Sequence, residues 1–132
     1  MNIYIDTSGF LAILDADDDN HLKAKETWVK LISSGDNLIC NNYVLVETFA
    51  LVLHRLGFEA VRVLQEDMLP VVRIEWVDEF THNMGISAML TASRRKLSLV
   101  DCVSFEMMRR LGLKKVFAID KHFSEQGFKC IP

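Results

Sequence analysis

The sequence is poor in residues that cross-link or interrupt a chain, because its 132 residues include only three cysteines and two prolines. Cys40, Cys102 and Cys130 lie far apart in apolar segments and match neither a zinc spacing nor a disulfide framework. We therefore expect small buried side chains in a protein of the reducing cytoplasm. The start of the chain lacks the pattern of a signal peptide, and no apolar run approaches the roughly 20 residues that cross a bilayer. These absences predict a cytoplasmic protein without a membrane segment.

An excess of basic residues is also missing, since the formal net charge is -3. Nucleic-acid-binding domains usually have an isoelectric point above about 9. A protein that holds metal ions must carry acids of its own, however, so mild acidity does not exclude a nucleic acid. Half of the residues are hydrophobic and a quarter are charged, which predicts one folded domain over residues 1–132.

Short apolar runs alternate with longer segments of helical pattern. We predict strands at 3–5, 37–40, 71–77, 115–119 and 128–131. We predict helices at about 8–15, 22–34, 42–56, 58–69, 79–94 and 99–112. This alternation predicts an α/β fold with three layers, α/β/α, around a mostly parallel five-stranded sheet. Ligands of such folds bind beyond the carboxyl ends of the strands.

Four acids stand out against this pattern. Asp6 and Asp120 each follow a predicted strand, at the edge where a ligand crevice is expected. Glu47 interrupts an apolar helix, and Asp101 lies in the apolar segment 97–105. A buried ionised carboxylate costs several kcal/mol unless it is paired or bound to a cation. The four acids therefore favour a shared site, in which we expect the carboxylates to lie within reach of one cation.

Each acid also has a simpler interpretation. Asp6 and Asp120 can be helix N-caps, and Asp101 can form a capping box with Ser98. Glu47 has no capping role, so its alternative is a buried ion pair with a partner such as His54 or Arg55.

The order of these acids along the whole chain resembles the motifs of the PIN-domain nucleases, and most closely those of the small VapC-type toxins. The matching segments are Ile5-Asp6-Thr7-Ser8, Glu47 in its apolar helix, Leu97-Ser98-Leu99-Val100-Asp101-Cys102 and Ala118-Ile119-Asp120-Lys121-His122-Phe123. Each motif is weak alone, and the set is specific through its order and spacing. One position departs from the family pattern, because His122 stands where many relatives carry a further acid. The number of bound ions is therefore open.

The resemblance implies a PIN-like domain in which Asp6, Glu47, Asp101 and Asp120 are catalytic and bind Mg²⁺ or Mn²⁺. It implies that Thr7 or Ser8 hydrogen-bonds within this cluster. The expected activity is hydrolysis of RNA phosphodiester bonds by metal-activated water, which is chemistry that hard oxygen ligands support. The resemblance further implies the toxin of a toxin–antitoxin pair, with a cognate antitoxin protein as partner and a homodimer as its assembly.

Basic residues near the predicted site are candidates for contacts with RNA phosphates. They are Arg94, Arg95, Lys96 and Lys121, with His122 beside them. The alternative is a solvated surface in which residues 94–96 complement the negative end of the preceding helix dipole.

Other readings fit the sequence less well. A signalling receiver needs a phosphoacceptor Asp after its third strand, whereas Glu47 and Asp101 lie within predicted helices. A calcium loop at 15–26 lacks the turn glycine, which is replaced by Asn20. A catalytically silent PIN-like module, which binds RNA or protein, would be expected to lack one of the four acids, and all four are present.

Overall fold

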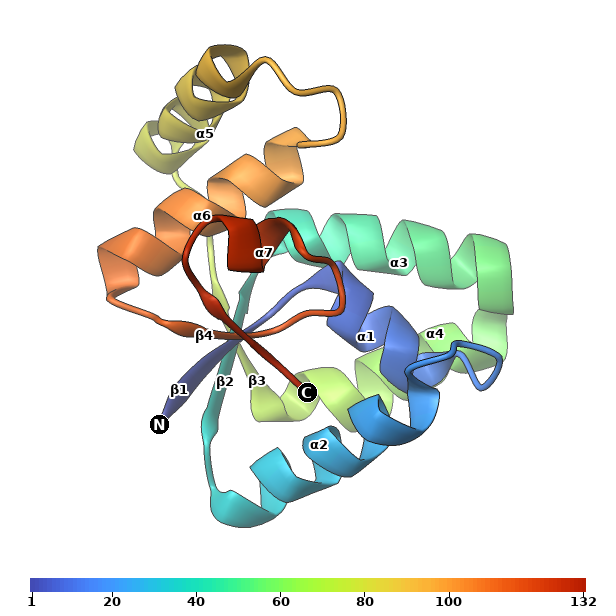
Figure 1. The fold of residues 1–132 in the computed structure, drawn as a ribbon. Coiled ribbons are helices and arrows are strands. Elements are labelled where there is room, and N and C mark those ends of the chain that lie inside the picture. The colour runs from blue at the N-terminus through green and yellow to red at the C-terminus, as the bar shows by residue number, and fades with distance from the viewer.

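A five-stranded sheet runs through the centre of the molecule, as the computed structural model of residues 1–132 shows (Figure 1). Its strands are β1 (Asn2–Ile5), β2 (Asn37–Asn41), β3 (Val72–Glu75), β4 (Lys115–Phe117) and β5 (Lys129–Ile131). All neighbouring strands are parallel, in the order β3-β2-β1-β4-β5. The chain moves from β1 toward β3 on one side and returns to β4 on the other. This reversal places a crevice beyond the carboxyl ends of β1 and β4.

Helices cover both faces of the sheet. They are α1 (Thr7–Leu14), α2 (His21–Ser34), α3 (Asn42–Leu56), α4 (Phe58–Val63), α5 (Glu79–Ala92), α6 (Leu99–Leu111) and α7 (His122–Glu125). One buried cluster joins the sheet to α1, α2 and α3, and includes Ile5, Phe10 and Val44. A second cluster joins the opposite face to α6 and α7, and includes Phe105 and Phe123. The predicted three-layer α/β/α architecture is confirmed.

Several predicted boundaries were wrong. The strand predicted at 71–77 is shorter, and β4 ends at Phe117 rather than at residue 119. The helix predicted at 58–69 is α only to Val63 and continues as the π-helical turn η1 (Leu64–Met68) and the 3₁₀ turn η2 (Leu69–Val71). Pro70 lies in η2, where its missing N–H and fixed φ oppose a regular helix. The short helix α7 was not predicted.

Two glycines allow close contacts between elements. A Cβ on Gly9 would lie 2.5 Å from the carbonyl oxygen of Phe117, so α1 packs directly against the end of β4. A Cβ on Gly85 would collide with the side chain of Val103, so α5 packs equally closely on α6. The first contact brings the start of α1 to the crevice, where the predicted site residues lie.

No helix of the structure is both long and apolar enough to cross a membrane. The three cysteines are free thiols. Cys40 and Cys102 are buried, as predicted, and Cys130 is partly exposed.

Candidate active site

The four predicted acids come from four different elements and meet at the carboxyl edge of the sheet. Asp6 follows β1 and caps α1, and Glu47 lies in the second turn of α3. Asp101 lies in the first turn of α6, and Asp120 lies between β4 and α7. Burial is the largest cause of the raised pKa of Asp6, Glu47 and Asp101. The charges of Asp101 and Glu47 also raise the pKa of Asp6, and the charge of Asp120 also raises the pKa of Glu47 and of Asp101. The carboxylates are therefore within electrostatic range of one another.

Asp6 is the most deeply buried of the four, with 4% of its surface exposed. Burial raises the pKa of Asp6 to about 6, against hydrogen bonds from Ser8 that favour the ionised form. The Ser8 backbone N–H and hydroxyl both donate to Asp6 Oδ2, at 3.1 and 2.8 Å. The site thus holds Asp6 in place but leaves its charge only partly compensated.

The hydroxyls of Thr7 and Ser8 connect the acids to their surroundings. Ser8 Oγ also accepts from the backbone N–H groups of Ile119 and Asp120, at 3.0 and 3.3 Å. One hydroxyl therefore ties Asp6 to the chain beyond β4. On the other side, a hydrogen bond from Thr7 lowers the pKa of Glu47, although burial raises it overall. Thr7 is itself held by Thr48, whose hydroxyl donates to it at 3.0 Å.

Glu47 is less buried than the sequence suggested. Its side chain is partly exposed, and it forms no ion pair, so the alternative pairing with His54 or Arg55 was wrong. Burial and the neighbouring acids Asp101 and Asp120 raise the pKa of Glu47 in the absence of any cationic side chain. The physical argument for a bound cation therefore rests more on Asp6 than on Glu47.

The capping interpretation holds for two of the three aspartates. Asp6 caps α1, and Asp101 forms the predicted capping box with Ser98, with hydrogen bonds of 3.1 and 3.2 Å. Asp120 is not the N-cap of α7, a position that Lys121 occupies, but its Oδ1 accepts from the His122 backbone N–H at 3.0 Å. Each of these aspartates uses one oxygen in a local hydrogen bond, and its second oxygen accepts no hydrogen bond from the protein. Capping and ligand binding are therefore compatible in the same residue.

The donor set fits a hard divalent cation. All four groups are carboxylates, which are the ligands preferred by Mg²⁺ and Mn²⁺. The expectation that they lie within reach of one cation is not met, because no three acidic, histidine or cysteine side chains are close enough to hold one metal ion. Like charges repel, so we expect such carboxylates to stay apart until a cation draws them together.

The predicted basic residues do not all face solvent freely. Arg94 forms an ion pair with Glu125 at 3.2 Å, whereas Arg95 and Lys96 are exposed in the loop between α5 and α6. Lys121 is exposed beside Asp120. His122 is largely buried, with Nε2 3.5 Å from Asp120 Oδ1 and with Nδ1 unpartnered.

Two hollows beside the acids contain residues that sequence reasoning missed. A cavity of 270 Å³ next to Asp120 is lined by Lys121 and by Lys23, which comes from the distant helix α2. A cleft of 410 Å³ next to Glu47 is lined by Tyr43 and His82. No local motif marks these residues, because only the fold brings them to the acids.

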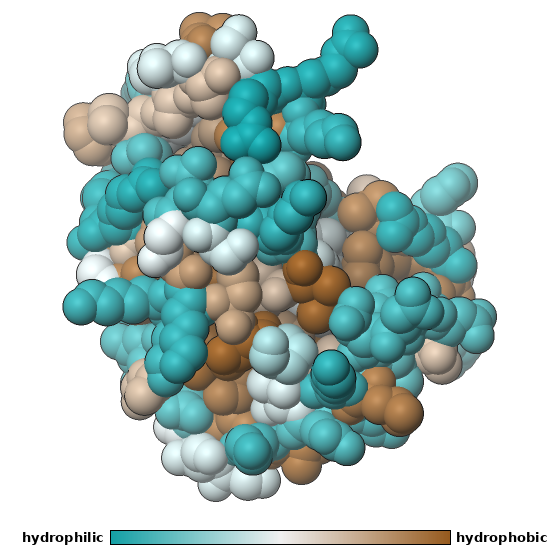
Figure 2. Space-filling model, viewed as in Figure 1, coloured by the Kyte–Doolittle hydropathy of each residue, from teal (hydrophilic) through white to brown (hydrophobic).

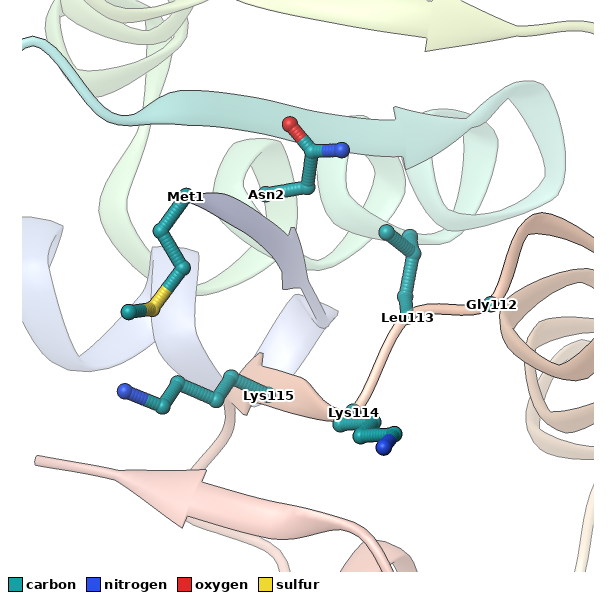
Figure 3. Close-up of a pocket in the computed structure, with 6 residues that line it drawn as sticks. All are labelled: Met1, Asn2, Gly112, Leu113, Lys114 and Lys115. Atoms are coloured by element: carbon teal, nitrogen blue, oxygen red, sulfur yellow. The ribbon is translucent and has the colours of Figure 1, made fainter.

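A further hollow of 330 Å³ lies at the opposite end of the sheet (Figure 3). Its lining residues are Met1, Asn2, Gly112, Leu113, Lys114 and Lys115, and none of them belongs to the acid cluster.

Comparison with known proteins gives a consistent result. The model of the PIN domain family matches residues 3–129. The chain is 33% identical over 127 residues to the 23S rRNA-specific endonuclease VapC20 of Mycobacterium tuberculosis, covering 96% of this chain and 95% of the relative. It is 23% identical over 132 residues to a VapC ribonuclease of Aquifex aeolicus, covering 96% and 93% of the two chains.

Solved structures agree with these sequence matches. The crystal structure of M. tuberculosis VapC20, described as a sarcin-ricin loop cleaving toxin, superposes with a TM-score of 0.85 at 32% identity, covering 96% of this chain and 95% of that one. The structure of FitAcB from Neisseria gonorrhoeae gives a TM-score of 0.71 at 16% identity over 100% and 97% of the chains, a likeness of fold alone. This chain therefore belongs to the PIN-domain family and, within it, is similar to the VapC toxins.

Proposed function

We propose that this protein is an Mg²⁺- or Mn²⁺-dependent endoribonuclease and the toxin of a toxin–antitoxin pair. The observation that carries the proposal is the placement of four carboxylates, from four elements, at the carboxyl edge of the sheet and within electrostatic range of one another. Burial and mutual repulsion raise the pKa of Asp6, Glu47 and Asp101, which is the electrostatic condition that a bound cation relieves. Similarity to VapC20, a 23S rRNA-specific endonuclease, supports RNA as the substrate.

Asp6, Glu47 and Asp101 are the proposed core of the metal site, and Asp120 completes it from the far side of the crevice. The aspartates would bind through the oxygens that their local hydrogen bonds leave unused. A bound Mg²⁺ or Mn²⁺ would supply an activated water and neutralise charge on the phosphate and the leaving oxygen. Ser8 keeps Asp6 in position through its two hydrogen bonds, and Thr7 lies beside Glu47.

Basic side chains around the crevice would hold the RNA backbone. Lys23 and Lys121 line one cavity with Asp120, and Arg95 and Lys96 lie exposed before α6. We assign Arg94 and His122 a weaker part, because Arg94 pairs with Glu125 and His122 is largely buried.

A protein partner is expected to cover exposed apolar side chains, which appear as separate patches among hydrophilic residues in Figure 2. Leu53 of α3 and Phe58 of α4 are 44% and 71% exposed. We propose an antitoxin and a second copy of the chain as the partners of such surfaces.

Two alternative functions make different predictions. A silent PIN-like module would bind RNA or protein without cleaving RNA. A receiver-type phosphoacceptor fits poorly, because receiver domains have the strand order 2-1-3-4-5 and the observed order is β3-β2-β1-β4-β5.

The proposal is tested by cleavage of a mixed RNA pool with Mg²⁺ or Mn²⁺, compared with EDTA. We expect Asp6→Asn, Glu47→Gln and Asp101→Asn each to lower the rate by about a hundredfold or more, since each removes a negatively charged ligand. Asp17→Asn, an exposed acid in the turn before α2, is the matched control and should keep full activity. Cleavage that survives EDTA or all three substitutions would contradict the metal site, and an inactive wild type that still binds RNA would favour the silent module.

A further inference from the structure

The cleft beside Glu47 is continuous with the acid cluster and is chemically unlike it. It lies between the start of α3, the first turns of α5 and the start of α6. Its lining residues are Asn42, Tyr43, Val46, Glu47, His82, Leu99 and Val100. Because Glu47 belongs to both, a group bound in the cleft lies directly beside the carboxylates. The volume of 410 Å³ is within the range of about 300–1,000 Å³ found for small-ligand sites.

An aromatic pair forms one wall of this cleft. A hydrogen bond of 2.5 Å joins the Tyr43 hydroxyl to His82 Nδ1, and the two rings pack edge to face with centroids 5.8 Å apart. This contact between α3 and α5 fixes the orientation of both rings. The rest of the wall is apolar and accessible, as Val46 is 71% exposed. The cleft therefore contains the ring of Tyr43, which its hydrogen bond to His82 keeps in place, among aliphatic side chains.

Two polar groups at the cleft have hydrogen-bonding capacity left over. Asn42 Oδ1 accepts from the Val77 backbone N–H at 2.7 Å, which fixes the amide and leaves its Nδ2 without a partner in the protein. In the tautomer in which Tyr43 donates to His82 Nδ1, His82 Nε2 carries a hydrogen and can donate. Such donors suit the carbonyl oxygens and ring nitrogens along the edge of a nucleobase.

We propose that this cleft binds an unpaired nucleobase of the RNA substrate, stacked on Tyr43, next to the phosphate held at the acid cluster. Stacking on aromatic side chains is how proteins hold splayed bases of single strands and loops. In a continuous duplex the bases remain stacked within the helix, so the cleft selects RNA that is single-stranded at this position. This inference rests on the proposed ribonuclease function and extends it to the residue that would hold the base, Tyr43.

The first test measures RNA affinity separately from cleavage. The probe is a fluorescein-labelled single-stranded RNA of mixed sequence, bound in the presence of Mg²⁺ by protein with the Asp6→Asn substitution, which suppresses cleavage. We expect adding Tyr43→Ala to weaken binding about five- to a hundredfold, the effect typical of losing one base–aromatic stack. Tyr43→Phe should bind like the parent, because it keeps the ring.

A matched control and a spectroscopic readout separate stacking from general damage. Val29→Ala shortens an apolar side chain that is 55% exposed on α2, outside both hollows beside the acids, and should leave RNA affinity unchanged. RNA containing 2-aminopurine should lose fluorescence when a base stacks on Tyr43, and Tyr43→Ala should abolish that loss. The same RNA annealed to its complement should show neither effect. Thermal unfolding verifies that the Tyr43 variants remain folded.

Three outcomes would overturn the inference. If RNA is cleaved and bound with equal affinity by the Tyr43→Ala protein, the base lies elsewhere while the proposed function stands. If Tyr43→Ala changes the sedimentation coefficient from dimer to monomer but leaves RNA affinity intact, the cleft is a protein interface. If the wild-type chain neither binds nor cleaves RNA, the proposed function fails, and the inference fails with it.

Discussion

Asp6 begins helix α1 and also faces the other acids, and both roles depend on which of its oxygens is engaged. Its Oδ2 accepts both hydrogen bonds from Ser8, which leaves Oδ1 for a ligand. Because Asp6 follows a predicted strand, the sequence allowed two roles for it, as a helix N-cap and as a site residue. In the structure the two roles are compatible, since the cap uses only Oδ2. The depth of burial could not be predicted, because it depends on how α1 packs on β4. Sequence therefore ranked Glu47 above Asp6, and packing reverses that ranking.

The raised pKa of Asp6 predicts a pH-dependent cost in stability. Between the unfolded value of 3.8 and the folded value of about 6, the native state holds a proton that the unfolded state releases, so stability falls as pH rises through this window. Asp6→Asn keeps a good N-cap and removes the charge. We expect the metal-free variant to be more stable than the wild type at pH 8, by up to about 3 kcal/mol.

Thermal unfolding in EDTA at pH 4 and at pH 8 checks this prediction. The difference between wild type and variant should be large at pH 8 and small at pH 4, where Asp6 is protonated in the folded state and only partly ionised in the unfolded state. Asp17→Asn, in an exposed turn, should show no such pH-dependent difference. A wild type more stable than Asp6→Asn at pH 8 would mean that Asp6 is paired rather than strained.

At the scale of elements, the helix–strand alternation was predicted well and the ends of elements were not. The sequence predicted α3 over its whole length, because a long apolar segment ends there at Gly57. It missed α7, which is only four residues long, and it read η1 as ordinary helix. Short turns depend on tertiary contacts, which periodicity does not record.

The contact between α1 and β4 supplies the prediction at this scale. Gly9→Ala would place a methyl group 2.5 Å from the Phe117 carbonyl oxygen, which belongs to backbone and cannot turn aside. Helix α1 must then shift and carry Asp6 and Ser8 with it. We expect a loss of about 1–3 kcal/mol in unfolding free energy, together with a fall in RNA cleavage.

Gly85→Ala is the comparison for this variant, because its methyl group would collide with the Val103 side chain in the α5–α6 contact, away from the acids. We expect it to lower the melting temperature, and the double change with Val103→Ala to recover part of the loss. Chemical denaturation and the cleavage assay measure both effects. Full activity and stability in Gly9→Ala would contradict the close contact between Gly9 and the Phe117 carbonyl oxygen.

At the scale of the whole molecule, α/β alternation predicted a mostly parallel sheet, and every strand pair is parallel. The strand order could not be predicted from one sequence, because no local pattern of residues indicates on which side of β1 the strand β4 pairs. That order places Asp6 and Asp120 on either side of the switch point. The four acids were named from sequence, whereas Lys23 and Tyr43 required the assembled fold.

The negative net charge of the molecule and its four neighbouring acids predict that divalent cations stabilise the folded state. With a net charge of -3 and four clustered carboxylates, the metal-free protein should repel RNA and carry internal strain. We expect millimolar Mg²⁺ or Mn²⁺ to raise the melting temperature of the wild type, in proportion to the logarithm of its concentration once the site is saturated. Calorimetry with NaCl at matched ionic strength as control measures this effect. An equal rise in Asp6→Asn and in the wild type would place the stabilising ions elsewhere.

The position of β1 at the centre of the sheet has a consequence for synthesis on the ribosome. Its neighbour β2 is made soon after it, but its other neighbour, β4, and Asp120 are made only when residues 115–120 emerge. A growing chain therefore carries Asp6 and Glu47 with one side of the crevice missing until β4 has been made. The four acids come together only after residue 120 has left the ribosome, so the shorter nascent chain has no complete site.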